Sequence, residues 1–498
     1  MRSKPFLFAA LCSAAVGCSD PFHFDTDSPP PAPADESCPA GSDWLPETPA
    51  VELYKPPPHP ASECQFYRAS WQNFLLATQP NADTGEIALQ SYPTIDDLFQ
   101  RTVPRPPPRA WLGDIKQAGG RQILIDQNGR PIYYGIQVNQ AFADFVHDNH
   151  LETADAIRNA RDDLFLPGDI VELKSAWQEV DDDDPSLPTY ITTQALVSTL
   201  RQENGQILEN HTAPRMVTVR MLALHVAFTL PGHPELIWST FEHTLGAPDT
   251  SAEDGHRDVA PIHPGATNPK LTDPNNLQDS TVVSKNDYIL YHGGTKVNAA
   301  NQGIAESDLT FDADSQTFPG TQTSIYRMFP ASKSNTAEPD GAISSLNENV
   351  QKLFEDNSAS LYGNDKRGYY RLVGALWLDK PEYFATNATL ENDTTSPFAS
   401  KPGFAADIAA NGTDSDFSIL AGEDRLSSTA MESFTQAPAA FPNCFSCHST
   451  QAVTEKGVPI DRDRQGAQLM EPKQINVSHV FSQFLLDEAN DARAATSD

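Results

Sequence analysis

The residues best suited to chemistry lie near the end of the chain, in the stretch PNCFSCHST at 442–450. Cys444, Cys447 and His448 stand there in the order C-x-x-C-H, which is rare by chance when 498 residues include six cysteines and 13 histidines. Such a motif attaches a c-type haem through both cysteines, and the histidine then ligates the iron. The same thiolates bind zinc where four protein ligands are available. A C-x-x-C pair alone can also act as a redox dithiol or close a disulfide.

The amino terminus indicates export. Residues 1–17 begin with Arg2 and Lys4 and continue with an apolar run, which is the pattern of a signal peptide and too short for a membrane anchor. Residues 15–18, Ala-Val-Gly-Cys, resemble the lipobox of bacterial lipoproteins. That resemblance implies lipidation of Cys18, and Ser19 after it implies sorting to the outer membrane. Ordinary signal cleavage followed by secretion is the alternative.

The number of cysteines bears on the choice between these chemistries. Cys12 leaves with the signal peptide, Cys18 takes the lipid and the motif uses two more, so that Cys38 and Cys64 remain. An even pair in an oxidising compartment is typical of a disulfide. Closing the loop between them would stabilise the fold by roughly 3–4 kcal/mol. No further cysteine lies near the motif to complete a zinc site, which favours haem over zinc.

The composition limits the partners. Asp and Glu number 67 against 34 Lys and Arg, for a formal charge of −33. Such a charge excludes nucleic acid and anionic lipid as partners of the folded surface. It suits a basic redox protein, or is simply a solvated acidic surface. The run Asp181–Asp184 lacks the ligand spacing of a calcium loop and is expected to be a surface loop.

The hydrophobic pattern predicts an α+β fold with a large, mostly antiparallel, β-rich domain and a short helical C-terminal segment. We expect a signal peptide at 1–17, a proline-rich tether at 18–45, the β-rich domain at 46–425 and the haem-binding segment at 426–498. Expected helices are 66–78, 140–163 and 345–361. Expected strands are a hairpin over 121–138 and the segments 169–180, 190–200, 215–230, 235–244, 287–294, 323–329 and 368–379.

The C-x-x-C-H motif and its surroundings resemble the c-type cytochromes, specifically large exported single-haem cytochrome c family proteins of Gram-negative bacteria. The motif covers 444–448, with looser similarity over 427–490. The resemblance implies one covalent haem c on Cys444 and Cys447, with His448 as the proximal ligand. It also implies a helix before the motif, at 427–436, and a closing helix after it, at 476–490. Only 50 residues follow His448, so we expect the upstream domain to cover part of the haem.

Three residues near the motif can supply the sixth ligand of the iron. His479 begins the expected closing helix and is our prediction. Met470 precedes that helix, as a distal methionine usually does in the family, and is the next candidate. Met431, a histidine of the β-rich domain or an open position are the remaining alternatives. Histidine would give a lower reduction potential than methionine.

The β-rich domain carries no recognisable catalytic motif. Its histidines His225, His233 and His243 lie close in sequence, but an apolar strand surrounds His225, which predicts a hydrogen-bonded core histidine. The sequence therefore favours an electron-transfer protein of the periplasm or outer membrane, anchored by lipid and served by a redox partner. A haem-containing oxidoreductase whose large domain acts on an unknown substrate is the alternative. A haem-stabilised binding protein at the cell surface is a third reading.

Overall fold

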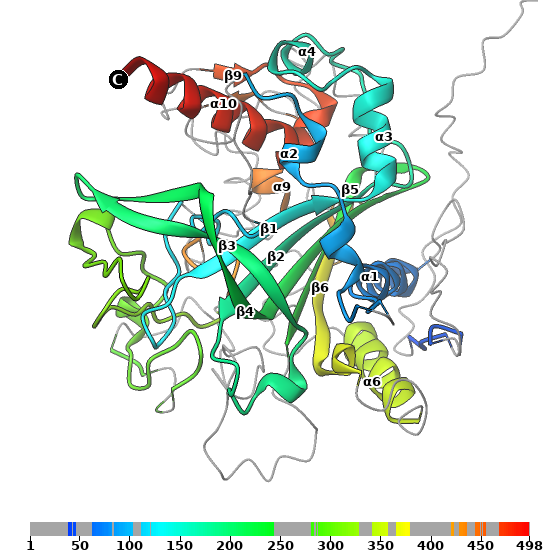
Figure 1. Ribbon diagram of the computed structural model, residues 1–498. Helices are drawn as coiled ribbons and strands as arrows, with labels where there is room; N and C mark the ends of the chain where they lie inside the picture. Colours follow the sequence, from blue (N-terminus) through cyan, green and yellow to red (C-terminus); the bar gives the residue numbers. More distant parts are fainter. Residues whose placement is uncertain are drawn as a thin grey trace, which may run out of the picture. The chain divides into compact units, whose positions relative to one another are not determined.

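One antiparallel sheet organises the part of the chain that the structure describes (Figure 1). Its strand order is β1-β2-β4-β5-β6-β7, and β3 pairs with β4 beside this path. All neighbouring strands are antiparallel. The strands are β1 (Ile132–Val138), β2 (Val171–Glu179), β3 (Thr192–Glu203), β4 (Gln206–Leu230), β5 (His233–His243), β6 (Tyr370–Leu378) and β7 (Leu420–Gly422).

The structure is a computed structural model. It describes residues 38–41, 43–45, 62–81, 84–102, 111–119, 121–243, 280–282, 285, 287–327, 341–356, 365–378, 420–422, 428–435, 444–448, 450, 452–454 and 468–497. These residues belong to one compact unit, Pro31–Asp498. The signal peptide, Cys18 and most of the predicted tether lie outside the described residues. Among those described, no helix combines the length and apolar composition needed to cross a bilayer.

Both faces of the sheet are apolar. On β4, Leu224 and Val226 belong to one buried cluster, whereas Ala223 and Ala227 belong to two others. Side chains alternate between the two faces of a strand, so this pattern means that each face is covered by another layer. The fold is therefore α+β with one large antiparallel sheet, as the sequence predicts.

Helices α1 (Glu63–Ala77) and α6 (Gly341–Asp356) cover the first face. Phe74 of α1 stacks on Phe241 of β5 with ring centroids 4.4 Å apart. Trp71 meets the same ring edge-on at 5.0 Å and donates its indole N–H to Asn347 of α6 over 3.1 Å. Aromatic contacts thus hold this layer on the sheet.

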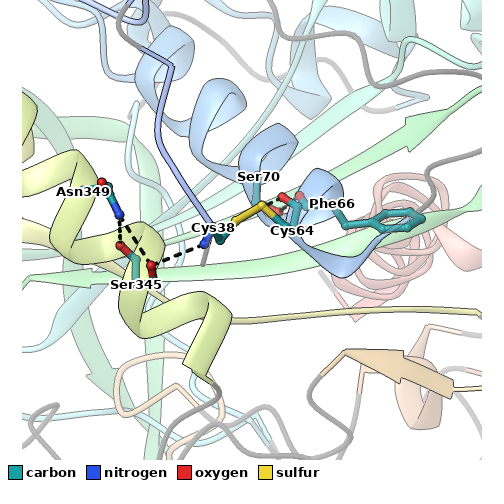
Figure 2. Close-up of a disulfide and its surroundings, with 6 residues drawn as sticks. All are labelled: Cys38, Cys64, Phe66, Ser70, Ser345 and Asn349. Carbon is teal, nitrogen blue, oxygen red and sulfur yellow. Dashed lines mark hydrogen bonds between the residues drawn. A yellow bond between two sulfur atoms is a disulfide. The ribbon is translucent and has the colours of Figure 1, made fainter. Parts of the chain in front are cut away.

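A disulfide fastens the chain before α1 to this layer, as Figure 2 shows. Cys38 and Cys64 are joined with an S–S distance of 2.01 Å and Cα atoms 5.5 Å apart. The backbone N–H of Cys38 also donates to the hydroxyl of Ser345 on α6 over 3.3 Å. The sequence predicts this pairing, and the structure confirms it. The bridge joins the last part of the predicted tether to α1, and the hydrogen bond from Cys38 joins it to α6.

The second face is covered by α10 (His479–Ser497) together with α2 (Ile95–Leu98), α3 (Gln140–Asp148) and α4 (Ala154–Arg158). Phe481 of α10 stacks on Phe142 of α3 at 5.6 Å, and Phe484 stacks on Phe99 at 4.5 Å. The apolar face of α10 is fully buried. Its members are Val480, Phe481, Phe484 and Leu485.

The predicted helix over 140–163 is wrong in length, because the chain turns after α3. Asn149 donates its amide to the carbonyl of Phe145 over 2.9 Å, and His150 takes a left-handed φ of 55°. Thr153 then starts α4 by accepting the N–H of Ala156 over 3.2 Å. Local side-chain bonds therefore divide one predicted helix into two.

Three further predictions about local structure are also wrong. Residues 287–294 form a tight turn with an isolated bridge between Tyr288 and Tyr291, and no strand forms over 323–327. Residues 428–435 form turns in place of a helix before the motif. There the Ser433 hydroxyl donates to the Thr429 carbonyl over 2.6 Å, and Glu432 accepts the N–H of Ser428 over 2.7 Å. Such side-chain bonds compete with helical ones.

We expect thiol labelling of the denatured, non-reduced protein to modify neither Cys38 nor Cys64. Replacing both by alanine should lower the free energy of unfolding by roughly 3–4 kcal/mol, because the unfolded chain regains the freedom that the bridge removes. Urea denaturation measures the loss, and the single variant Cys64→Ala should lose a similar amount. Strong labelling of either cysteine in the wild-type protein would contradict the pairing.

Candidate functional site

The C-x-x-C-H motif forms a short helix, α9 (Cys444–Cys447), against the second face of the sheet. The backbone N–H of His448 donates to the carbonyl of Cys444 over 2.8 Å, which extends the helical turn. Phe445 is buried with 1% of its surface exposed and fixes α9 in the apolar layer. The side chain of Cys447 lies outside the described residues.

Two aromatic rings and one carbonyl contact the His448 imidazole. Its centroid lies 3.8 Å from that of Trp238 on β5 and 3.6 Å from that of His479 at the start of α10. Its Nδ1 lies 3.0 Å from the backbone carbonyl of Val477. Because a carbonyl only accepts, this bond places the proton on Nδ1 and leaves the lone pair on Nε2. An imidazole held in this way is prepared to bind a metal through Nε2.

The electrostatics keep His448 neutral. Burial lowers the pKa of His448 well below its usual range, and the neighbouring His479 lowers it further. The bond to the Val477 carbonyl raises the pKa but does not reverse the shift. A neutral imidazole is the form that ligates a metal, so no proton has to be displaced from Nε2.

A polar row crosses the apolar face of the sheet near the motif. Lys174 on β2, His225 on β4 and Thr240 on β5 stand opposite one another in register. His225 Nδ1 lies 2.8 Å from the Thr240 hydroxyl, and Nε2 lies 2.5 Å from the Glu432 carboxylate. Burial raises the pKa of Glu432, but the charge and hydrogen bond of His225 bring it below its usual value. The row therefore contains a histidine that is paired with an ionised carboxylate.

The adjacent row contains a buried carboxylate. Glu172 on β2 stands opposite Ala227 on β4, which in turn stands opposite Trp238 on β5. The hydroxyl of Ser478 donates to Glu172 over 2.7 Å. Burial raises the pKa of Glu172 to about 7, against the opposing effects of the Ser478 bond and Lys174. Glu172 thus contacts the residue that joins Val477 to His479.

The other histidines of the β-rich domain have partners of their own. His233 donates to the buried carboxylate of Glu235 over 2.8 Å. His243 stacks on Tyr190 at 3.6 Å and donates to the carbonyl of Thr189 over 2.9 Å. Burial lowers the pKa of His243 to about 3. The described contacts thus place only His225, among the three histidines singled out from the sequence, near the motif.

The two candidate methionines occupy different clusters. Met470 is buried on β9 (Gln468–Met470), which pairs with β8 (Val453–Thr454), and it shares an apolar cluster with Phe445. Met431 lies in a separate cluster with Tyr134. The imidazole that contacts His448 belongs to His479. Trp238 was not singled out from the sequence, and neither was Glu172 or Lys174, because each lies far from the motif along the chain.

The residues around the motif fit a haem in their donor set. His448 offers Nε2, and the indole N–H of Trp238 is buried without an acceptor among the described residues. A carboxylate on a bound group would satisfy such a donor. Among the described residues no three His, Cys, Asp or Glu side chains stand together to hold a bare metal ion. The stacked imidazoles are 3.6 Å apart, so an iron ligated by both requires His479 to move away from His448.

We expect Glu172 to make stability depend on pH. Its native pKa of about 7 lies above the ordinary value of 4.5, so its contribution is fully present below pH 4.5 and is lost as pH rises through 7. The variant Glu172→Gln is neutral at every pH. Its free energy of unfolding, compared with that of the wild-type protein, should therefore be higher at alkaline pH than at acid pH by up to about 3 kcal/mol. Urea denaturation at both ends of this range measures the difference. The exposed Glu86→Gln should show no such gain, and an equal effect of Glu172→Gln at all pH values would contradict the assignment.

Comparisons of the chain with protein-family models, with curated proteins and with solved structures find no match. The central feature of the site is the neutral, half-buried imidazole of His448, which donates from Nδ1 to the Val477 carbonyl, lies beside Trp238 and stacks on a second imidazole. Such an arrangement suits a metal-containing group that is held by nitrogen and sulfur.

Proposed function

We propose that the protein is an exported c-type cytochrome that carries one covalent haem and transfers electrons at the periplasm or outer membrane. The haem would be attached to Cys444 and Cys447, with His448 as its proximal ligand. The observation that carries the proposal is the bond from His448 Nδ1 to the Val477 carbonyl, which leaves Nε2 for the iron. A bound haem supplies one-electron chemistry, and the protein sets its potential.

The residues of the second face supply the surroundings of this centre. The apolar cluster that contains Phe445, Val477 and Phe481 excludes water and so lowers the local dielectric. Trp238 presents a buried indole N–H that can donate to a propionate. Burial keeps His448 neutral, which removes proton competition for Nε2. These features support electron transfer without release or uptake of a proton at the proximal ligand.

The proposed sixth ligand is His479, and Met470 is the alternative. The support for His479 is its contact with His448, since its imidazole begins α10 and lies next to the motif helix. Ligation by His479 would require its imidazole to leave the stack on His448. Met470 is buried in the same cluster and would need β9 to reorient.

The partners follow from charge and targeting. The chain carries a formal charge of −33, which favours association with a basic redox protein and excludes nucleic acid. The proposed lipid on Cys18 would hold the protein at a membrane of a Gram-negative cell. The lipidated cysteine and its signal peptide lie outside the described residues.

One observation favours the second candidate function, a haem-containing oxidoreductase. His225 forms a hydrogen-bonded pair with Glu432 in the row beside the motif, and a simple electron carrier does not need such a pair. A histidine and a carboxylate in contact can hold and move a proton. If the sixth position of the iron is open, this pair could supply or accept a proton in a reaction at that position.

We expect the mature protein, expressed together with cytochrome maturation machinery, to carry the mass of one covalent haem. Cys444→Ala combined with Cys447→Ala should abolish attachment, since both thioethers are lost. Cys38→Ala combined with Cys64→Ala is the matched control and should keep the haem. Intact-protein mass spectrometry decides the matter, and a wild-type mass without haem would refute the proposed function.

We expect His479→Ala to change the visible spectrum from low spin to high spin and to allow carbon monoxide to bind the reduced protein. Met470→Ala should leave the low-spin spectrum unchanged, because its sulfur is not the ligand. Absorbance spectra of the oxidised and reduced proteins, with and without carbon monoxide, test both variants. A low-spin His479→Ala protein with the wild-type potential would show that another residue is the ligand. A high-spin wild-type protein would favour the oxidoreductase.

A further inference from the structure

We propose that Glu172 is a positioning residue of the redox centre: through the hydroxyl of Ser478 it holds the neighbouring Val477 carbonyl on His448 Nδ1, and its charge adjusts the reduction potential. This inference rests on the proposed haem function. It names a proton-linked regulation of the same site by a residue 272 positions away from Cys444 along the chain.

Three consecutive residues, at 477–479, connect Glu172 to His448. Val477 accepts the Nδ1 proton of His448 over 3.0 Å, and His479 stacks on the same imidazole at 3.6 Å. Ser478 stands between them and donates its hydroxyl to Glu172 over 2.7 Å. A shift of Ser478 therefore moves both contacts of His448 together.

Ser478 is fully buried and has its hydrogen-bonding capacity in use. Its backbone N–H donates to the carbonyl of Ile475 over 3.1 Å, which closes the short helix before α10. Its oxygen accepts the N–H of Val480 over 3.3 Å, in the manner of an N-cap. The single hydroxyl proton then goes to Glu172. The first turn of α10 is thus tied to the sheet through one carboxylate.

The surroundings of Glu172 allow its charge to act on the neighbouring redox centre. Its cross-strand neighbours are uncharged, namely Val138 on β1 and Ala227 on β4. The charged or titratable groups nearby are Lys174 on its own strand, His225 in the next row and His479 after Ser478. Helix α3 also packs on β2, and its titratable side chains are exposed; they are Asp144, His147 and Asp148. A charge on Glu172 is therefore weakly screened by solvent.

Electrostatics gives the sign of the effect. An ionised carboxylate in a low-dielectric layer stabilises the oxidised centre, which is one unit more positive than the reduced centre. When the redox partner delivers an electron, Glu172 binds a proton from water more tightly, and it releases the proton on oxidation. Since burial raises the pKa of Glu172 to about 7, this exchange falls within the neutral range. The equilibrium constant for reduction of the centre should then fall up to about tenfold per pH unit as Glu172 ionises.

The test is the pH dependence of the midpoint potential of the full-length haem protein, measured by spectroelectrochemistry. The wild-type potential should fall with rising pH around neutrality. Glu172→Gln keeps an acceptor for Ser478 and carries no charge, so it should keep the low-spin spectrum, lose this inflection and stay at the high potential. Ser239→Ala is the matched control: its buried hydroxyl donates to the Val226 carbonyl over 2.8 Å, in a contact that does not reach the motif. It should keep the wild-type profile.

A second pair of variants tests the route through the hydroxyl. Ser478→Ala removes the hydroxyl and should alter both the spectrum of the ligated imidazole and the pH profile, whereas Ser478→Thr keeps the hydroxyl and should restore them. This pair also decides the matter if Glu172→Gln does not fold. A flat wild-type profile, or an inflection that survives Glu172→Gln or Ser478→Ala, would overturn the inference. A haem-loaded protein with either result leaves the proposed function standing, whereas absence of covalent haem refutes the proposed function.

Discussion

The central sheet is apolar on both faces, and this constraint determines what the rest of the chain has to do. A two-faced apolar sheet is stable only when each face is covered, because exposed apolar area is costly in water. Helices α1 and α6 cover one face, and the disulfide at Cys38 fastens the chain beside them. The C-terminal residues cover the other face together with α3. The motif at 444–448 is therefore part of the second layer and shares its core with the sheet.

Polar side chains buried in an apolar layer need hydrogen-bond partners, and the segment Val477–His479 supplies them. Buried hydrogen-bonding groups need partners, since an unpaired one costs free energy. His448 finds the Val477 carbonyl, and Glu172 finds the Ser478 hydroxyl. The two polar groups are satisfied from one short stretch at the start of α10. A change in either contact is consequently transmitted to the other, because Val477 and Ser478 are adjacent in the chain.

The sequence predicts the short-range features of this arrangement but not the contacts between distant segments. The C-x-x-C-H spacing and the hydrophobic pattern that predicts the strands are short-range features, and both can be read from the sequence. The neighbours Trp238, Lys174 and Glu172 come from strands whose register fixes which side chains face the motif, and register depends on pairing between distant segments. The turns at 428–435 were missed for another reason. Serine side chains there bond to nearby backbone, whereas the helix was expected from the resemblance to c-type cytochromes.

The large upstream domain has a physical role if the C-terminal residues hold a haem. A macrocycle held by the motif alone would stay exposed to water. Strands β2, β4 and β5 supply a wall that is fixed by cross-strand hydrogen bonds on both sides. A rigid wall keeps the dipoles and charges near His448 in place when the centre changes charge, so little reorganisation accompanies electron transfer. The same wall holds the His225–Glu432 pair and Glu172 at fixed positions. A large sheet is therefore a reasonable scaffold for a single centre whose potential depends on a few buried charges.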